Sequence, residues 1–163
     1  MATIEERLTA LEAAVARWEE ASAEATPSPE RSPDFWMLEG LEQRHPEGVV
    51  AYAGHAALAA GPVRWQVGVP VEPLLGANWA EIAARLDALA HPVRLRLAQL
   101  ALQGTETTAE LAADADLGTT GQLHHHLRQL VAAGWLQSAG RGRYRVPAQR
   151  VVPLLAVVAA ARD

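Results

Sequence analysis

Side chains that can recognise another molecule gather on a segment expected to be a helix, residues 119 to 133. Leu123, Leu127 and Leu130 are spaced four and three residues apart, which places them on one buried stripe of that helix. The remaining surface carries hydroxyl, amide, imidazole and guanidinium groups, which can hydrogen-bond to base edges and phosphates. His126, three residues after Leu123, is expected to be packed and hydrogen-bonded instead. The residues expected to contact DNA from this helix are Thr119, Thr120, Gln122, His124, His125 and Arg128.

An arginine-bearing turn follows this helix. Trp135 to Ala139 and Arg143 to Val146 alternate as two short strands around Gly140-Arg141-Gly142. The two glycines permit a tight turn and leave the Arg141 side chain free of bulky neighbours. An arginine at such a tip can enter a minor groove or meet a phosphate, so Arg141 and Arg143 are further candidate DNA contacts.

Charge is distributed unevenly along the chain. Residues 1 to 47 hold four arginines and eleven acidic residues, and the whole chain has a net charge of −5. In contrast, no acidic residue occurs between Asp116 and Asp163. Such local asymmetry indicates a segment that meets a polyanion. The arginines of this segment are Arg128, Arg141, Arg143, Arg145, Arg150 and Arg162.

Composition excludes several chemistries. The chain of 163 residues has no cysteine and no lysine, so disulfides, thiolate metal sites and lysine Schiff bases are absent. Sequence patterns typical of zinc proteases, P-loop nucleotidases, serine hydrolases and dinucleotide-binding enzymes do not occur. We therefore expect no catalytic residues and no cofactor. No apolar run is long enough to span a bilayer, and the acidic start does not resemble a signal peptide, so we expect a cytoplasmic protein without a membrane partner.

The N-terminal segment of the chain is expected to form a dimer contact rather than to bind DNA. A seam of apolar residues at spacings of 4, 3, 4 and 3 predicts a heptad helix over residues 2 to 25, in a dimerisation segment of residues 1 to 25. Its partner is either the rest of the chain or, as we favour, a second copy. A proline-rich linker, Thr26 to Pro33, follows, and then a short helix from the N-cap Asp34. The seam consists of Ile4, Leu8, Leu11, Val15 and Trp18.

A β-hairpin is expected over residues 48 to 70, which completes a middle region of residues 26 to 77. Strict alternation from Val63 to Val67 is typical of a half-buried strand. The alanine-rich residues 56 to 60 are either part of the hairpin or a helical turn. Aromatic side chains here suit an apolar, ring-containing effector, although they can equally fill a small core. The candidate effector contacts are Trp36, Tyr52, His55 and Trp65.

Capping patterns define the helices of residues 78 to 163. Asn78 with Glu81 opens a helix to Ala90, and His91-Pro92 opens the next, which Gly104 ends. Thr107 with Glu110, and Thr119 with Gln122, open two more, the second closed by Gly134. The packing face of the helix after Pro92 is expected to be Val93, Leu95, Leu97, Leu100 and Ala101.

The last helix, Val151 to Ala161, is almost wholly apolar and is expected to begin around Pro153. A helix so poor in polar groups is typical of a surface that another subunit covers. We therefore expect it to form a dimer interface. The residues of this interface are expected to be Leu154, Leu155, Val157 and Val158.

The segments LAHPVRLRLAQLAL, TTAELAA, TTGQLHHHLRQLVAAGWL and GRGRYRV occur in this order. Together they resemble the ArsR-type winged helix-turn-helix repressors of bacteria, over residues 78 to 163. The resemblance implies a homodimer that binds an operator and leaves it when an effector binds. It also implies that Thr119 to Ala133 is the recognition helix and Gly140 to Arg143 the wing tip. The expected fold is mainly α with small β hairpins, a winged helix-turn-helix domain extended by an N-terminal helix and a hairpin.

Metal sensing, which occurs in that family, is not expected. Three consecutive histidines on a helix point about 100° apart and cannot converge on one ion. The cysteines and the acidic last helix that the family uses for metals are missing, as residues 111 to 114 and 153 to 161 show. The sequence thus predicts a homodimeric regulator of transcription that binds double-stranded DNA. An apolar small molecule is expected as a further partner, the effector. The alternative is a winged-helix module that binds a protein or a ligand without contacting DNA.

Overall fold

The computed structural model describes residues 8–9, 12–13, 15–17, 36–113 and 120–162. The chain divides into two compact units, Met1–Pro46 and Glu47–Asp163. The described residues are mostly helical and form two antiparallel two-stranded sheets. None of their helices is long and apolar enough to cross a membrane.

In the first unit, the described residues of the predicted heptad helix are helical, and Leu8 and Val15 are exposed. The other three seam residues, the linker and the expected N-cap Asp34 lie outside the described residues. Pairing with a second copy stays a prediction. Helix α2, Trp36–Arg44, confirms the short helix expected after the linker.

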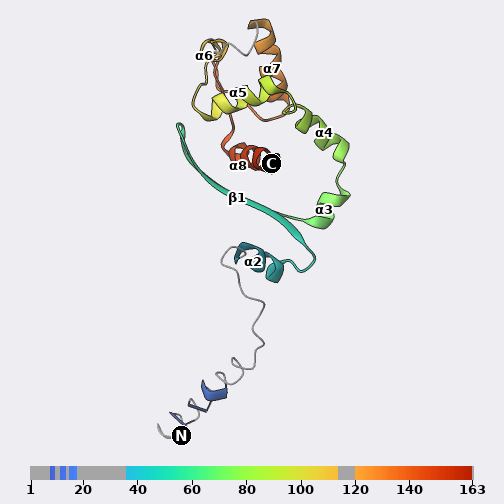
Figure 1. Cartoon of the computed structure of the whole chain (residues 1–163), viewed down its shortest axis with the longest axis vertical. Coiled ribbons are helices and arrows are strands. Elements are labelled where there is room, and N and C mark those ends of the chain that lie inside the picture. Colours follow the sequence, from blue (N-terminus) through green and yellow to red (C-terminus); the bar gives the residue numbers. More distant parts are fainter. Residues whose placement is uncertain (1–7, 10–11, 14, 18–35, 114–119, 163) are drawn as a thin grey trace. The chain divides into compact units, whose positions relative to one another are not determined.

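The second unit begins with a hairpin. Strands β1, Val49–Leu58, and β2, Gly61–Pro70, pair antiparallel from Val49↔Pro70 to Leu58↔Gly61. The expected hairpin is thus confirmed, and the alanine-rich stretch continues β1 and then turns. Both strands contact helix α8, Ala148–Ala160, which Figure 1 shows on the concave side of the curved hairpin. The approach is close at Gly54, because a Cβ placed there would lie 2.9 Å from Cγ1 of Val152.

Five helices connect the hairpin to the second sheet. They are α3 (Val71–Gly76), α4 (Trp79–Asp87), α5 (Pro92–Leu102), α6 (Thr108–Ala112) and α7 (Thr120–Ala132). Sequence capping patterns located most of the boundaries. Thr107 and Glu110 form a complete capping box on α6, and the imidazole of His91 accepts from the amide of Val93 at the start of α5.

The start of α4 differs from the expected capping box. The Asn78 side chain accepts from the amide of Ala80 at 3.2 Å, and its own amide donates to the Glu81 carboxylate at 3.0 Å. The contact between Asn78 and Glu81 therefore joins two side chains and leaves the reciprocal backbone bond unmade. Helix α4 ends at Asp87, three residues before Ala90, and a turn follows in which the carbonyl of Ala88 accepts from the side chain of Arg94.

The second sheet is smaller than expected. Strands β3, Gln137–Ser138, and β4, Tyr144–Arg145, are two residues each. An isolated bridge between Thr107 and Arg143 widens the sheet, and the amide of Tyr144 donates to the carbonyl of Glu106 at 2.8 Å. The loop before α6 therefore lies along the edge of β4.

The core of the second unit lies among α5, α6, α7, α8 and the second sheet. Leu123, Leu127 and Leu130 are all buried, which confirms the predicted stripe of α7. Leucines from five segments fill the centre, so the hydrophobic stripe of each helix is covered by its neighbours. The most deeply buried side chains are Leu97, Leu111, Leu123, Leu127, Leu130, Leu136 and Leu154.

The predicted packing face of α5 is partly wrong. Leu95 is 40% exposed, whereas Arg94 is only 8% exposed. Arg94 shares the stripe of Leu97, Ala98 and Ala101, since residues three, four and seven apart lie on one side of a helix. Hydrophobicity alone predicted that Leu95 is buried and Arg94 exposed. Hydrogen bonds of Arg94 to other elements bury the arginine instead.

The prediction that the last helix begins around Pro153 is also wrong. Helix α8 begins at Ala148, and Pro153 lies inside it. An interior proline costs about 3 kcal/mol. Each buried valine or leucine contributes roughly 1.5–3 kcal/mol, and Val151, Val152 and Leu154 are all buried. Their burial offsets the loss. Because Leu154 belongs to the core of its own chain, only the other three expected interface residues remain exposed.

Candidate nucleic-acid interface

Helix α7 presents its polar side chains outward. Thr120, Gln122, His124 and Arg128 are exposed. Thr120, His124 and Arg128 follow one another at a spacing of four and share one side of the helix, whereas Gln122 lies about 160° from His124 around the helix. Thr119 lies outside the described residues. A Cβ added to Gly121 would meet no atom within 4 Å, so the chain itself does not require glycine there. The structure therefore leaves four of the expected contacts of α7 accessible, with Gly121 among them at the start of the helix.

The three consecutive histidines have different surroundings. His124 and His125 are exposed, while His126 is half-buried with its ring centroid 4.7 Å from that of His91. Packing of His126 was predicted correctly, but its Nδ1 has no hydrogen-bond partner among the described residues, so the expected hydrogen bond is missing there. Burial, followed by the positive charges of His91, Arg94 and His125, lowers the pKa of His126.

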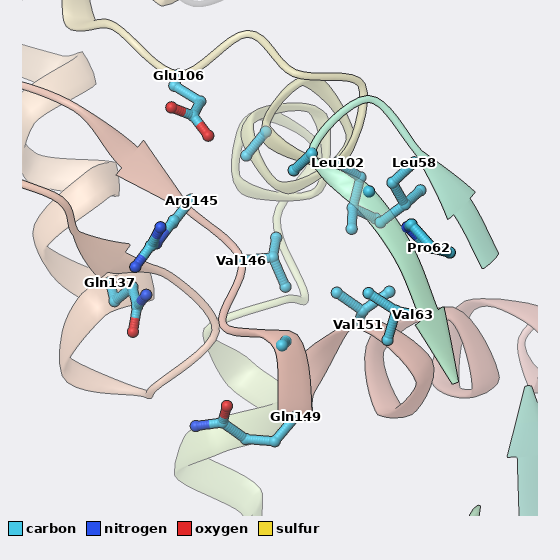
Figure 2. A pocket seen from close by; sticks show the side chains of 14 residues that line it. Leu58, Pro62, Val63, Leu102, Glu106, Gln137, Arg145, Val146, Gln149 and Val151 are labelled. Atoms are coloured by element: carbon cyan, nitrogen blue, oxygen red, sulfur yellow. The ribbon is translucent and has the colours of Figure 1, made fainter. Parts of the chain in front are cut away.

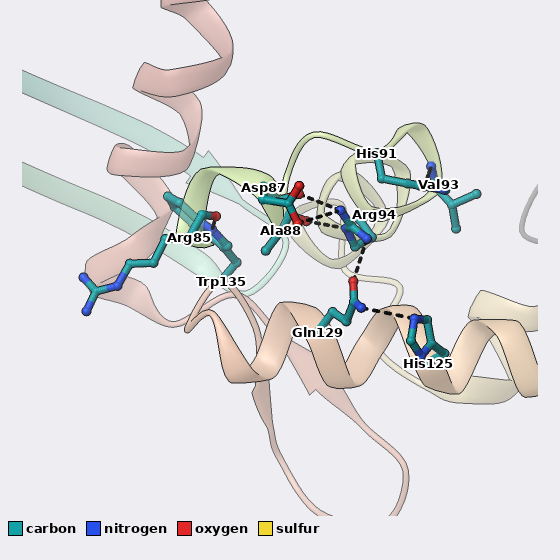
Figure 3. Close-up of polar contacts among 9 residues, drawn as sticks. All are labelled: Arg85, Asp87, Ala88, His91, Val93, Arg94, His125, Gln129 and Trp135. Carbon is teal, nitrogen blue, oxygen red and sulfur yellow. Dashed lines mark hydrogen bonds and ion pairs between the residues drawn. The ribbon is translucent and has the colours of Figure 1, made fainter. Parts of the chain in front are cut away.

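A buried arginine holds α7 against the end of α4. Nε of Arg94 donates to the carbonyl of Ala88 at 2.6 Å, and Nη2 donates to the carbonyl of Asp87 at 2.5 Å. Nη1 donates to Oε1 of Gln129 at 2.6 Å. Figure 3 shows the guanidinium between the two carbonyls and the amide of Gln129. These charge-assisted bonds satisfy the carbonyl of Ala88 and add a donor to that of Asp87, which also accepts from the amide of Ala90 at 3.0 Å.

The same contacts extend to the exposed His125. Because Oε1 of Gln129 accepts from Arg94, its amide nitrogen faces Nε2 of His125, at 3.1 Å (Figure 3). Nε2 of His125 must then accept, so the neutral ring carries its proton on Nδ1. His125 is therefore held by a contact chain that starts inside the protein, which orients its ring on the α7 surface.

The turn between β3 and β4 places Arg141 in an unusual backbone conformation. Its φ is +50°, between Gly140 at +79° and Gly142 at +72°. The carbonyl of Gly142 accepts from the amide of Thr108 at 2.9 Å, which joins the turn to the start of α6. A non-glycine residue in the left-handed region costs about 1–2 kcal/mol, and such strain concentrates at functional sites. The exposed Arg141 therefore occupies a position where glycine would be unstrained.

Arg143 is not a free cation as the sequence led us to expect. Its Nη2 lies 3.0 Å from Oε2 of Glu106, and its Nε donates to the same oxygen at 3.2 Å. Glu106 partly neutralises it, although half of the Arg143 side chain remains exposed. Sequence reasoning missed Glu106, since the two residues are 37 positions apart. Within the described residues, the side chains of Arg128 and Arg141 have no hydrogen-bond or ion-pair partner.

Two more arginines of the acid-free segment, Arg150 and Arg145, contact other side chains of the protein, whereas Arg162 is exposed near the end of the chain. Arg150 stacks over the ring of Trp135 at 5.4 Å. With the Gln137 amide oriented so that its oxygen faces Arg145, that oxygen accepts from Nε at 2.7 Å and from Nη2 at 3.1 Å. The arginines of this segment are therefore divided between those with partners in the protein and the exposed Arg128, Arg141 and Arg162.

The expected effector residues are distributed over the two units and over both faces of the hairpin. Tyr52 pairs with Val67, and Trp65 pairs with Gly54, so both aromatic side chains lie on the hairpin face that contacts α8. His55 pairs with Arg64 on the opposite face, because successive residues of a strand alternate. Trp36 is 72% exposed on α2, in the other unit. His55 and Trp65 both line a pocket of about 480 Å³ on the hairpin, and the grouping of all four residues stays a prediction.

No three histidine, aspartate or glutamate residues in the described ranges lie close enough together to hold a metal ion. Comparisons with protein-family models, curated proteins and solved structures find no match for this chain. The functional argument therefore depends on the geometry of α7 and the Arg141 turn.

Proposed function

We propose that this chain is a sequence-specific DNA-binding regulator of transcription, acting as a repressor. One observation carries the proposal. The exposed face of α7 and the turn with Arg141 both belong to a segment that has no acidic residue from Leu117 to Arg162. Hydrogen-bonding groups on α7 can read base edges in a major groove, and Arg128 and Arg141 can bind phosphates.

The order of elements supports a winged helix-turn-helix assignment for residues 78 to 163. Helix α5 is followed by a short extended segment that pairs with β4, then by α6, α7 and the β3–β4 hairpin. In this assignment α7 is the recognition helix and β3–β4 is the wing. The bridge between Thr107 and Arg143 fixes the wing to α6, so the tip is held in place relative to the helices.

A twofold dimer fits the exposed apolar surface between α5 and α8. A groove of about 510 Å³ is lined there mostly by apolar residues. Leu95 and Leu155 are each 40% exposed at this groove, as is Val158. We propose that the same surface of a second copy covers it, because a self-complementary apolar patch is what a twofold interface requires. Each subunit then offers one α7 to an inverted repeat with half-sites about 10 bp apart, or a multiple of that spacing.

Selection of bound duplexes from a random pool tests the proposal directly. We expect the selection to enrich an imperfect inverted repeat. Fluorescence anisotropy at several salt concentrations then measures the affinity of the protein for this repeat. Gln122→Ala should change the preferred base at one position of each half-site. Arg141→Ala should weaken binding to all duplexes similarly and reduce the salt slope by about one. Arg162→Ala is the control, because it removes one arginine outside α7 and the turn.

Sedimentation equilibrium tests the dimer. Leu95→Glu combined with Val158→Glu should give monomers that bind the inverted repeat weakly. Val50→Glu, at an exposed valine of the hairpin, is the matched control and should leave the dimer intact. A selection without any enriched sequence, together with wild-type affinity of both α7 and turn variants for random DNA, would refute the proposed function.

A further inference from the structure

A cavity of about 470 Å³ lies beside the second sheet in the second unit. Its walls come from the turn end of the hairpin, the end of α5, the loop before α6, the strands β3 and β4, and the start of α8 (Figure 2). This volume lies within the range of about 300–1,000 Å³ typical of small-molecule sites. It is separate from the hairpin residues considered above as effector contacts.

The walls of the cavity differ in polarity. In Figure 2, Glu106, Arg145 and Gln137 lie on one side, and apolar side chains lie on the other. A pocket of this kind suits a ligand with an apolar body and one polar end, because the apolar body leaves water while the polar end keeps hydrogen bonds. The principal apolar residues are Leu58, Pro62, Val63, Leu102, Val146 and Val151.

The net charge on the polar side of the cavity indicates which charge a bound ligand carries. The carboxylate of Glu106 is neutralised by Arg143, which lies 3.0 Å away. Arg145 contacts the neutral amide of Gln137 and pairs with no carboxylate among the described residues. One positive charge therefore remains uncompensated at the polar side. A guanidinium favours a planar carboxylate, which can accept two parallel hydrogen bonds from it.

We propose that this cavity binds a small amphipathic carboxylate, a monocarboxylic acid with an aromatic or medium-length aliphatic body. Its carboxylate is held by Arg145, and its body lies against the apolar side formed by the hairpin, α5 and α8. The binding itself does not depend on the function proposed above.

An effect of this ligand on DNA rests on the proposed function. Glu106 lines the cavity, and its carboxylate holds Arg143 while its carbonyl accepts from the amide of Tyr144 at 2.8 Å. A bound carboxylate competes with Glu106 for nearby arginines and shifts the base of the β3–β4 hairpin. Arg141, at the tip of that hairpin, then changes position relative to α7.

Calorimetric titration of the full-length protein with 1-naphthoate and with octanoate tests the binding. Naphthalene-1-methanol and octanol are the neutral controls. We expect each acid to bind at a single site, about tenfold or more tightly than its alcohol. Arg145→Gln should remove the difference between acid and alcohol. Ala148→Phe, at an exposed alanine that lines the cavity, should weaken all four compounds.

Arg162→Gln is the charge-matched control and should bind like the wild type. Thermal unfolding of each variant establishes that it is folded. The proposal is overturned when neither acid binds, or when Arg145→Gln retains the preference for acids. Anisotropy with the selected inverted repeat separates the two proposals: binding of the acids without any binding of DNA refutes the regulator alone. Binding of DNA without binding of the acids refutes the cavity proposal alone.

Discussion

Replacement of the buried Arg94 by methionine should destabilise the second unit strongly. The Arg94 guanidinium donates three short hydrogen bonds, to the carbonyls of Asp87 and Ala88 and to the side chain of Gln129. Methionine fills a similar volume and leaves no buried charge behind, so the substitution isolates the loss of these bonds. The exposed Arg85 of α4 offers the matched control Arg85→Met.

The size of the expected loss of stability follows from the hydrogen bond that each acceptor loses. Ala88 is 5% exposed, so its carbonyl stays unsatisfied at a cost of about 1–3 kcal/mol. Asp87 is exposed and can bind water instead, and Gln129 is half-buried. Part of the loss is offset, because the desolvation of a guanidinium costs several kcal/mol in the wild type. We expect a decrease of about 2–4 kcal/mol in the free energy of unfolding, or roughly 10 °C in Tm.

Urea denaturation followed by circular dichroism, at one fixed protein concentration, measures this change. Arg85→Met should remain within about 0.5 kcal/mol of the wild type. Arg94→Lys should also destabilise, because an ammonium cannot reach three acceptors arranged around a planar fork. A double-mutant cycle with Gln129→Ala should give a coupling energy of about 1 kcal/mol or more. Equal stability of the Arg94→Met and Arg85→Met variants would show that the buried hydrogen bonds contribute nothing net.

Three further predictions concern other parts of the second unit. Arg141→Asn should leave stability unchanged or raise it by about 0.5 kcal/mol, because asparagine tolerates the left-handed region. The same substitution should lower the affinity for DNA. A loss of stability with unchanged affinity would contradict this account of the turn. Gly54→Ala should cost about 1–3 kcal/mol in urea denaturation, because its Cβ meets Val152, and Gly54→Ala with Val152→Ala should be more stable than the sum of the single changes predicts; strict additivity refutes the close contact. His126 has a lowered pKa, so the unfolded chain binds its proton first as pH falls below about 6.5, and stability declines from there down to the lowered pKa. His126→Gln should flatten this decline in Tm measured against pH, whereas His124→Gln, at an exposed ring, should retain it.

Local patterns predicted much of α7 and of its neighbours. The spacing of three leucines identified the buried stripe of α7, and the capping box of Thr107 and Glu110 located the start of α6. The Gly-Arg-Gly pattern located the turn that presents Arg141. These features depend on residues within about four positions of one another, which the sequence displays directly.

Contacts between distant residues decided the rest. Arg94 is buried because Gln129, 35 positions later, and the end of α4 supply its acceptors, and hydropathy therefore ranked it wrongly against Leu95. The start of α8 was misplaced because burial of the residues around Pro153 outweighs the interior proline.

The sequence by itself determined which face of α7 is polar, where the arginine turn lies and that acidic residues avoid both. Only the tertiary structure decided which arginines have partners. Glu106 pairs with Arg143, the neutral amide of Gln137 contacts Arg145, and the ring of Trp135 lies under Arg150. The hairpin, α5 and α8 also enclose the Arg145 cavity only when folded together. The physical reason is that charge pairing and cavity shape depend on distances in space, which helix and strand periodicity do not specify.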